Sequence, residues 1–178
     1  MMRKFKRIDL TNATEDYFLK VGEEAYISFS DATQIPLRIA TEAGTYYQLL
    51  LISSNQGGMS GGSGDNLYLY PNNTSYTNQF AGAQITRYNP TTGYYTNWWT
   101  TEKAFWLSHP FCNGFYYITN GAVRELRGIV DTYGRPTAYP CLRLIASTWR
   151  NNATPWTILG TVVSPVPISG EILVRRLK

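Results

Sequence analysis

The sequence has very few of the residue types that metal sites and most enzyme active sites need. Among 178 residues there is one histidine, and there are two cysteines, Cys112 and Cys141, with no CxxC motif. One histidine and two distant cysteines do not complete a structural zinc site without carboxylates, and no Asp-rich loop of the calcium-binding type occurs. We therefore expect no metal and no cofactor. The cysteines fit either one disulfide or two buried thiols, and the absence of secretion signals favours the thiols.

The arrangement of nucleophiles and acids also argues against catalysis. His109 is the only candidate base, close to Ser108 and Cys112. An activated nucleophile needs a base at hydrogen-bond distance that a third group orients, but residues three apart on an extended segment point in opposite directions. The acid pairs at 15–16 and 23–24 fall on opposite faces of a strand, whereas a glycosidase needs facing carboxyls roughly 5–9 Å apart. We expect no enzyme; a glycan-active enzyme with scattered carboxylates is the weakest of three alternatives.

Charge and long apolar runs are scarce as well. Charged residues make up 16% of the chain, against an average of about 25%. No apolar run approaches the roughly 20 residues of a membrane-spanning helix. The basic start MMRKFKR is not followed by the apolar segment of a signal peptide. The sequence therefore predicts a protein made in the cytoplasm, with no signal peptide and no membrane insertion.

The net charge of +4 comes from the two ends of the chain. Four cations lie in residues 1–7 and three in residues 175–178, whereas residues 8–174 hold nine basic residues against 12 acids, a balance of −3. Nucleic-acid-binding domains more often carry a basic stripe along one face, so we do not expect nucleic acid as the main ligand. Basic ends can equally dock on an acidic protein surface. The candidate docking residues are Arg3, Lys4, Lys6, Arg7, Arg175, Arg176 and Lys178.

Strand-forming residues are abundant, with 43% apolar and 15% aromatic residues. Apolar and aromatic runs recur about every ten residues between Gly, Pro, Asn and Asp clusters, which is typical of an all-β sandwich or barrel. We predict an antiparallel β-sandwich, jelly-roll-like, with at most one short helical turn, at 11–18. The expected strands are 5–10, 17–21, 25–29, 37–40, 46–53, 67–70, 80–88, 94–100, 104–108, 115–119, 123–130, 142–149, 156–163 and 171–177.

The domain plan is simple. Residues 1–15 form a basic N-terminal arm or first strand, and residues 16–178 form one β-sandwich domain with a flexible Gly-rich loop at 54–66. Asn120-Gly121 is the preferred pair for a two-residue type I′ hairpin, and residues 89–93 form a longer hairpin loop. Pro165 and Pro167 indicate a connection between the last two strands. Apolar residues on both faces of 171–177 predict that the C-terminus is tied down in a sheet or by a neighbouring subunit.

Aromatic residues concentrate between Tyr94 and Tyr117, where ten of 24 residues are aromatic. Adjacent aromatic pairs place one ring on each face of a strand, so about half of these rings lie outside a one-sided core. They form a subunit interface or a sugar-stacking platform, unless a two-layer sandwich closes over both faces. The candidate interface or stacking residues are Tyr94, Tyr95, Trp98, Trp99, Trp106, Tyr116 and Tyr117.

Two segments carry a resemblance to a known class of proteins. The Gly/Ser/Asn/Thr/Tyr-rich stretch 57–95 and the ending 156–176, with Trp156-Thr-Ile-Leu-Gly and Ser169-Gly-Glu-Ile-Leu-Val-Arg-Arg, resemble β-sandwich or jelly-roll virion proteins of tailed bacteriophages and prophages. These are capsid-decoration, head-fibre and tail-tip proteins. The resemblance implies a non-enzymatic virion component, often homotrimeric, that contacts capsid or tail subunits. The main alternative is a carbohydrate-binding or receptor-binding module that stacks Tyr95, Trp98 or Trp99 on a host-surface glycan.

Overall fold

The computed structural model describes residues 5–54, 66–74, 80–89, 93–102, 104–108, 112–132, 141–149 and 156–178. Within them it contains thirteen strands and one short 3-10 turn, so the all-β class is confirmed. The helical turn lies at Pro71–Asn73 and not at 11–18, where the backbone forms turns and bends up to residue 15 and a short strand at 17–18. The elements are β1 (Lys6–Asp9), β2 (Tyr17–Phe18), β3 (Glu23–Pro36), β4 (Ile39–Ala40), β5 (Thr45–Ser54), β6 (Leu67–Tyr70), η1 (Pro71–Asn73), β7 (Phe80–Asn89), β8 (Gly93–Glu102), β9 (Phe105–Ser108), β10 (Cys112–Asn120), β11 (Arg124–Thr132), β12 (Cys141–Trp149) and β13 (Thr161–Arg176).

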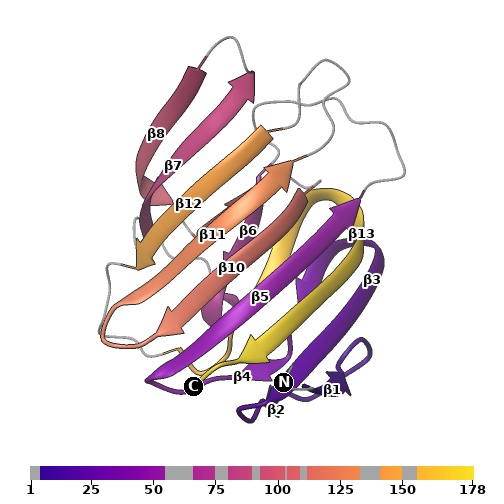
Figure 1. The fold of residues 1–178 in the computed structure, drawn as a ribbon. Helices are drawn as coiled ribbons and strands as arrows, with labels where there is room; N and C mark the ends of the chain where they lie inside the picture. The colour runs from indigo at the N-terminus through magenta and orange to yellow at the C-terminus, as the bar shows by residue number, and fades with distance from the viewer. Residues whose placement is uncertain are drawn as a thin grey trace.

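Eleven of the strands form one sheet, and β2 and β4 form a separate parallel pair. The order in the large sheet is β1-β3-β13-β5-β10-β11-β12-β7-β8, and β6 joins it through β13 and β9 (Figure 1). Within the large sheet every pairing is antiparallel except that of β1 with β3. Residues 6–9 of the predicted N-terminal arm are therefore the first strand of this sheet. The predicted hairpin at 89–93 is confirmed as the β7–β8 pair.

Two long strands, β3 and β13, extend beyond the main row of strands, and β13 connects it with β6 and β9. The C-terminal part of β13, from Gly170, lies between β3 and β5, whereas its first three residues pair with the end of β3 and with β6. β6 in turn pairs with β9, which lies against β10, β11 and β12. Figure 1 shows β6 behind β10 and β11. One face of the sheet is thus covered by β6 and β9; the sandwich and jelly-roll arrangement itself stays a prediction, because the strands belong to one continuous sheet.

The predicted break at the C-terminal prolines is wrong, since β13 runs through them as a single strand of 16 residues. Its ladder with β3 shifts register between Val163 and Ile168, so Pro165 and Pro167 fall in a bulge. Proline has no backbone N–H to donate, and it is tolerated in a bulge because the ladder needs no hydrogen bond from that residue. Residues 156–160 of the expected strand 156–163 lie outside any strand and form only one isolated bridge, at Ile158.

The predicted two-residue hairpin at Asn120-Gly121 is also corrected. Asn120 pairs with Arg124, which leaves a loop of three residues, 121–123, and neither Asn120 nor Gly121 has a positive φ. The reason lies in the Asn120 side chain, which is completely buried. Its Nδ2 donates to the carbonyl oxygens of Glu42 (2.9 Å) and Trp156 (3.1 Å), and its Oδ1 accepts from Arg124 Nε (3.1 Å). These bonds hold Asn120 in the strand and move the turn one residue further along the chain.

The core lies between the inner face of the sheet and the covering strands. Alternate residues of β5 and β10 point into it, so the burial alternates with the strand period of two. At one end Trp149 stacks on Trp156, with 5.0 Å between ring centroids, and Phe105 of β9 meets Trp156 edge-on. The buried apolar residues form a single cluster that reaches from Leu10 to Val174. Of the predicted flexible loop at 54–66, residues 55–65 lie outside the described part.

Candidate functional site

The basic residues near the N-terminus are engaged in ion pairs within the chain. The parallel register of β1 and β3 sets Lys6 beside Glu23 and Arg7 beside Glu24. Lys6 Nζ lies 3.5 Å from Glu23 Oε1, and Arg7 Nη2 lies 3.0 Å from Glu24 Oε1. Both glutamates are buried, whereas both cations keep most of their surface in solvent. Lys6 and Arg7 therefore neutralise buried acids, which is a structural task; Arg3 and Lys4 lie outside the described residues.

The C-terminal cations also have partners within the chain. Arg175 Nε donates to the second carboxylate oxygen of Glu24 at 2.5 Å, so this acid is held by two guanidinium groups. Arg176 bonds Glu42 Oε1 and the Leu19 carbonyl oxygen, each at 3.0 Å. The ammonium of Lys178 lies over the Tyr46 ring, 5.6 Å from its centroid. The described cations of both termini thus fasten β1 and β13 at one end of the sheet (Figure 1). That they dock on a particle stays a prediction.

Glu23 has the most extensive set of partners among these acids. The backbone N–H of Lys20 donates to Glu23 Oε2 at 3.0 Å, and the hydroxyl of Tyr17 donates to the same oxygen at 3.1 Å. The backbone hydrogen bond, together with the weaker effects of Tyr17 and Lys6, lowers the pKa of Glu23 against the opposing effect of burial. The β1–β3 junction is therefore most stable when Glu23 is ionised.

Two of the seven candidate aromatic residues belong to the core. Tyr116 is completely buried and Trp106 nearly so, because β9 covers this part of the sheet. The hydroxyl of Tyr116 donates to the Leu107 carbonyl oxygen at 3.1 Å, and Trp106 Nε1 donates to Asn66 Oδ1 at 3.1 Å. Neither ring presents a surface for a sugar or a subunit, so their assignment to such a surface is corrected.

Two glycines create the space that Tyr116 occupies. Gly114 lies two residues earlier on the same face of β10, and Gly128 is the direct partner of Tyr116 on β11. A Cβ atom at Gly114 would lie 2.2 Å from the Tyr116 hydroxyl oxygen, and one at Gly128 would lie 2.4 Å from Tyr116 Cδ1. The ring therefore lies across the backbone of both glycines. Both glycines are visible in the sequence, but the sequence alone does not indicate that they contact the same tyrosine.

The other candidate aromatics lie elsewhere. Tyr117, the neighbour of Tyr116, points to the opposite face of the sheet and is 48% exposed. The remaining four are in β8, which is the last strand in the sheet order: Tyr94, Tyr95, Trp98 and Trp99. Their side chains lie outside the described part, so their use as an interface or a stacking platform stays a prediction.

The outer face of the sheet carries a continuous row of apolar side chains. Phe115 of β10 pairs directly with Leu50 of β5 on one side and with Ile129 of β11 on the other. The same register continues at both ends, which places six residues side by side across six strands. The row, which we call the outer row, consists of Tyr26, Leu173, Leu50, Phe115, Ile129 and Leu144.

Several members and neighbours of the outer row are open to solvent. Ile129 and Leu144 are 52% and 48% exposed, and Leu142, Ile52 and Tyr117 extend the apolar surface along the same strands. Figure 1 shows β5, β10, β11 and β12 side by side with no other labelled element in front of them. The sequence does hold a signal for this surface, because residues 49–52 are all apolar and therefore place apolar side chains on both faces of the strand. That pattern is typical of strands buried on both faces.

Chemically reactive groups are few in the described residues. No group of three or more metal-ligating side chains occurs there, and His109 lies outside them. Cys112 is a free thiol that burial keeps protonated, with its pKa raised to about 11. In the strand register Thr132 separates Cys112 from Cys141. Two strand spacings, about 10 Å, exceed the Cα separation of about 7 Å beyond which a disulfide does not form.

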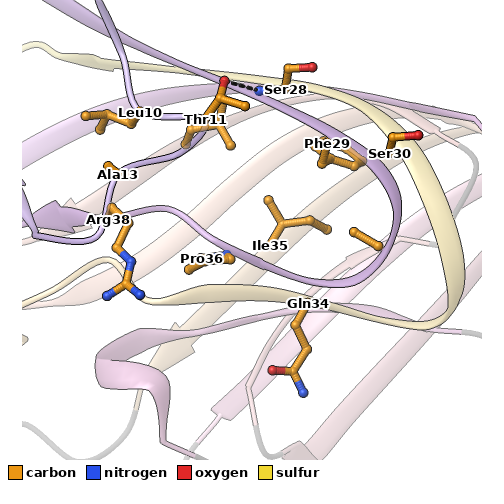
Figure 2. Close-up of a pocket in the computed structure, with 12 residues that line it drawn as sticks. Leu10, Thr11, Ala13, Ser28, Phe29, Ser30, Gln34, Ile35, Pro36 and Arg38 are labelled. Carbon is orange, nitrogen blue, oxygen red and sulfur yellow. Dashed lines mark hydrogen bonds between the residues drawn. The ribbon is translucent and has the colours of Figure 1, made fainter.

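One pocket lies beside β3, apart from the outer row. It has a volume of about 210 Å³ and is enclosed by the loop after β1 and the bend of β3 (Figure 2). Thr11 Oγ1 closes one side by accepting a hydrogen bond from the Ser28 N–H at 3.0 Å. Arg38 is the one charged residue in its lining, and its guanidinium lies 3.9 Å from Asp16. The pocket presents no pair of groups that acid–base chemistry requires.

Comparisons with known proteins return no relative. No protein-family model, no curated protein and no solved structure matches the chain. Among the described residues no helix is long and apolar enough to cross a membrane. The assignment of a function therefore rests on the sequence and the surface chemistry of this chain.

Proposed function

We propose that the protein is a non-enzymatic structural subunit of a bacteriophage-type virion, which associates with copies of itself and docks on capsid or tail proteins. The observation that supports this proposal is the exposed apolar surface along the outer row. Contiguous apolar patches of several hundred Å² on a soluble domain mark protein-interaction sites or grooves for ligands. The outer row runs along an open sheet face, and the pocket beside β3 lies apart from it.

The internal contacts of the fold suit a structural role. Both termini are fastened at the same end of the sheet by ion pairs to Glu24, one from Arg7 and one from Arg175. The virion setting rests on the resemblance of stretches 57–95 and 156–176 to virion proteins.

Sedimentation velocity over a concentration series tests the proposal. The wild-type protein is expected to sediment as an oligomer, and Ile129→Lys is expected to shift it to the monomer, because a lysine there places a charge in the centre of the apolar surface. The matched control is Val21→Lys, which changes a 60% exposed aliphatic residue in the turn before β3. The control should sediment as the wild type does. A wild-type protein that is monomeric at every concentration overturns the proposal.

A second candidate function is carbohydrate binding, and the position of β8 favours it. β8 is the last strand in the sheet order, and its sequence contains the adjacent pairs Tyr94-Tyr95 and Trp98-Trp99. Aromatic residues concentrated on an edge strand are suited to stacking on sugars. A glycan array that shows binding, lost in Trp98→Ala or Trp99→Ala, would favour this function, and an array without hits removes it.

A further inference from the structure

Charged residues flank the outer row in a regular pattern. On β11, Ile129 lies between Arg127, two residues before it, and Asp131, two residues after it. On β13, Leu173 lies between Glu171 and Arg175 in the same way. Side chains two residues apart on a strand share a face, so all four charges lie on the outer face together with the row.

The strand register sorts these charges by sign. Asp131 pairs with Asn113, which pairs with Ile52, which pairs with Glu171, so both acids lie on one side of the outer row. On the other side Arg127 connects to Arg175 through Tyr117 and Gln48. The surface is thus an apolar stripe with an acidic border on one side and, on the other, a border of two arginines, Arg127 and Arg175, that are each paired with a glutamate of this chain. Within the described residues, neither Asp131 nor Glu171 forms a side-chain hydrogen bond or ion pair.

We propose that a second copy of this chain packs on the outer face, with a two-fold axis that runs along the outer row. This inference rests on the proposed self-association and adds its geometry. Rotation by half a turn about this axis brings the acidic border of one copy opposite the arginine border of the other. Each strand then faces the same strand of the partner. Asp131 then faces Arg127 of the partner subunit, and Glu171 faces Arg175 of the partner subunit. Symmetry repeats each contact, which gives four pairs of opposite charge around an apolar centre.

The arginines have donors for these contacts. Arg127 holds Glu125 through Nε and Nη2, at 2.9 and 2.8 Å, and Arg175 holds Glu24 through Nε. A guanidinium has five N–H donors, so each of these arginines has N–H groups left to donate to a further carboxylate. The Arg127 side chain is 68% exposed, which leaves it free to reach outward.

The dimensions of the surface fit a stable dimer. Across the sheet, six strands at a spacing of about 4.8 Å span about 29 Å. Along each strand, seven residues at about 3.4 Å per residue span about 24 Å, which gives a footprint of about 700 Å². Stable protein pairs bury about 800 Å² on each partner. Two twisted sheets that pack face to face keep their strands within about 30° of each other, and a two-fold axis across the strands produces this aligned arrangement. A partner of one charge sign, such as a nucleic acid, would satisfy only one border.

Charge reversal and exchange on β11 test the proposal by sedimentation equilibrium. In either Arg127→Asp or Asp131→Arg, residues 127 and 131 of the two copies carry the same charge where they meet, and symmetry repeats this repulsion. Each variant should therefore raise the dimer dissociation constant at least about tenfold. The double variant R127D/D131R exchanges the two borders on β11 and should restore the wild-type constant to within about threefold. Glu15→Lys, in the exposed loop after β1, makes the same change of charge as Asp131→Arg away from the face and should have no effect. Thermal melts show that each variant is folded.

The outcomes separate this inference from the proposed function. If Ile129→Lys dissociates the protein while both charge reversals leave the constant unchanged, the two-fold geometry is overturned and self-association stands. The geometry also fails if the reversals weaken association and the double variant does not restore it, or if the mass is that of a trimer. A wild-type monomer overturns both proposals. Weakening by each reversal, together with rescue by the double variant, supports the two-fold pair.

Discussion

The substitution Gly128→Ala tests how the inner face of the sheet is packed. A Cβ atom at this position would lie 2.4 Å from Tyr116 Cδ1, 2.9 Å from Tyr116 Cε1 and 3.1 Å from the Phe115 carbonyl oxygen. The ring cannot move away, because it is fully buried and its hydroxyl is bonded to the Leu107 carbonyl oxygen of β9. The backbone of Gly128 has no positive φ, so alanine strains no dihedral angle. The steric contact with Tyr116 is therefore isolated from backbone effects.

The magnitude follows from three contributions. Overpacking of a dense core costs about 1–3 kcal/mol. A lost or lengthened hydrogen bond from Tyr116 to Leu107 costs about 1 kcal/mol more. Alanine restricts the unfolded chain more than glycine does, and this effect offsets about 0.5 kcal/mol of the loss. We expect a net loss of about 2.5 kcal/mol in the free energy of unfolding, which lowers the melting temperature of a chain of this size by about 5–10 °C.

Urea denaturation and calorimetry measure the effect, and two variants serve as references. Gly121→Ala is the matched control, because a Cβ atom there meets nothing closer than 3.7 Å; its stability should stay within about 0.5 kcal/mol of wild type. Tyr116→Leu shortens the side chain, so the combination with Gly128→Ala should cost less than the sum of the single changes by at least about 1 kcal/mol. If Gly128→Ala is as stable as Gly121→Ala, the described packing of Tyr116 is refuted.

Three further predictions concern buried polar groups. Asn120→Ala removes four hydrogen-bonding contacts and leaves Arg124 without its Oδ1 acceptor, so urea denaturation should show a loss of about 2–4 kcal/mol. Because the pKa of Glu23 is lowered in the folded state, its contribution to stability is complete above its ordinary pKa of about 4.3 and is lost as the pH falls below that value. The urea midpoint should therefore drop with acidification through this range, and less steeply in Glu23→Gln; equal slopes would contradict the assignment. In a Cys141→Ser variant, Cys112 should react with a thiol reagent at pH 8 only after unfolding, since its pKa is raised to about 11; rapid reaction of the native protein would show that the site is open.

Local sequence patterns were sufficient for the all-β class and for most strand positions. The strand at 67–70 was predicted with its observed bounds, because Leu67 and Leu69 alternate with tyrosines next to Pro71. The pattern failed at Pro165 and Pro167, since a bulge can accommodate prolines only where the partner strand is known. Sequence rules for turns also failed at the β10–β11 hairpin. Asn120 matches the preferred turn pair, but partners from distant parts of the chain hold it in the strand.

The candidate surfaces depended even more on tertiary structure. The basic ends were recognised as a feature, but their acidic partners Glu23, Glu24 and Glu42 follow only from the pairing of β1 and β13 with β3 and from the position of β5. Tyr116 and Tyr117 are neighbours in sequence and lie on opposite faces, and composition does not tell which face is covered. The outer row joins residues from six strands, so the order of the strands was needed to bring Ile129 beside Leu144 and Phe115.

Hydroxyl-radical footprinting of the unmodified protein tests most directly whether the outer face is the assembly surface. The labelling of Ile129, Leu144 and Tyr117 is measured by mass spectrometry at low and at high protein concentration. The account predicts that these side chains become protected at high concentration while Val21, which is exposed away from the face, is labelled equally in both samples. Equal labelling of the outer row at all concentrations, or protection confined to another surface, would contradict it.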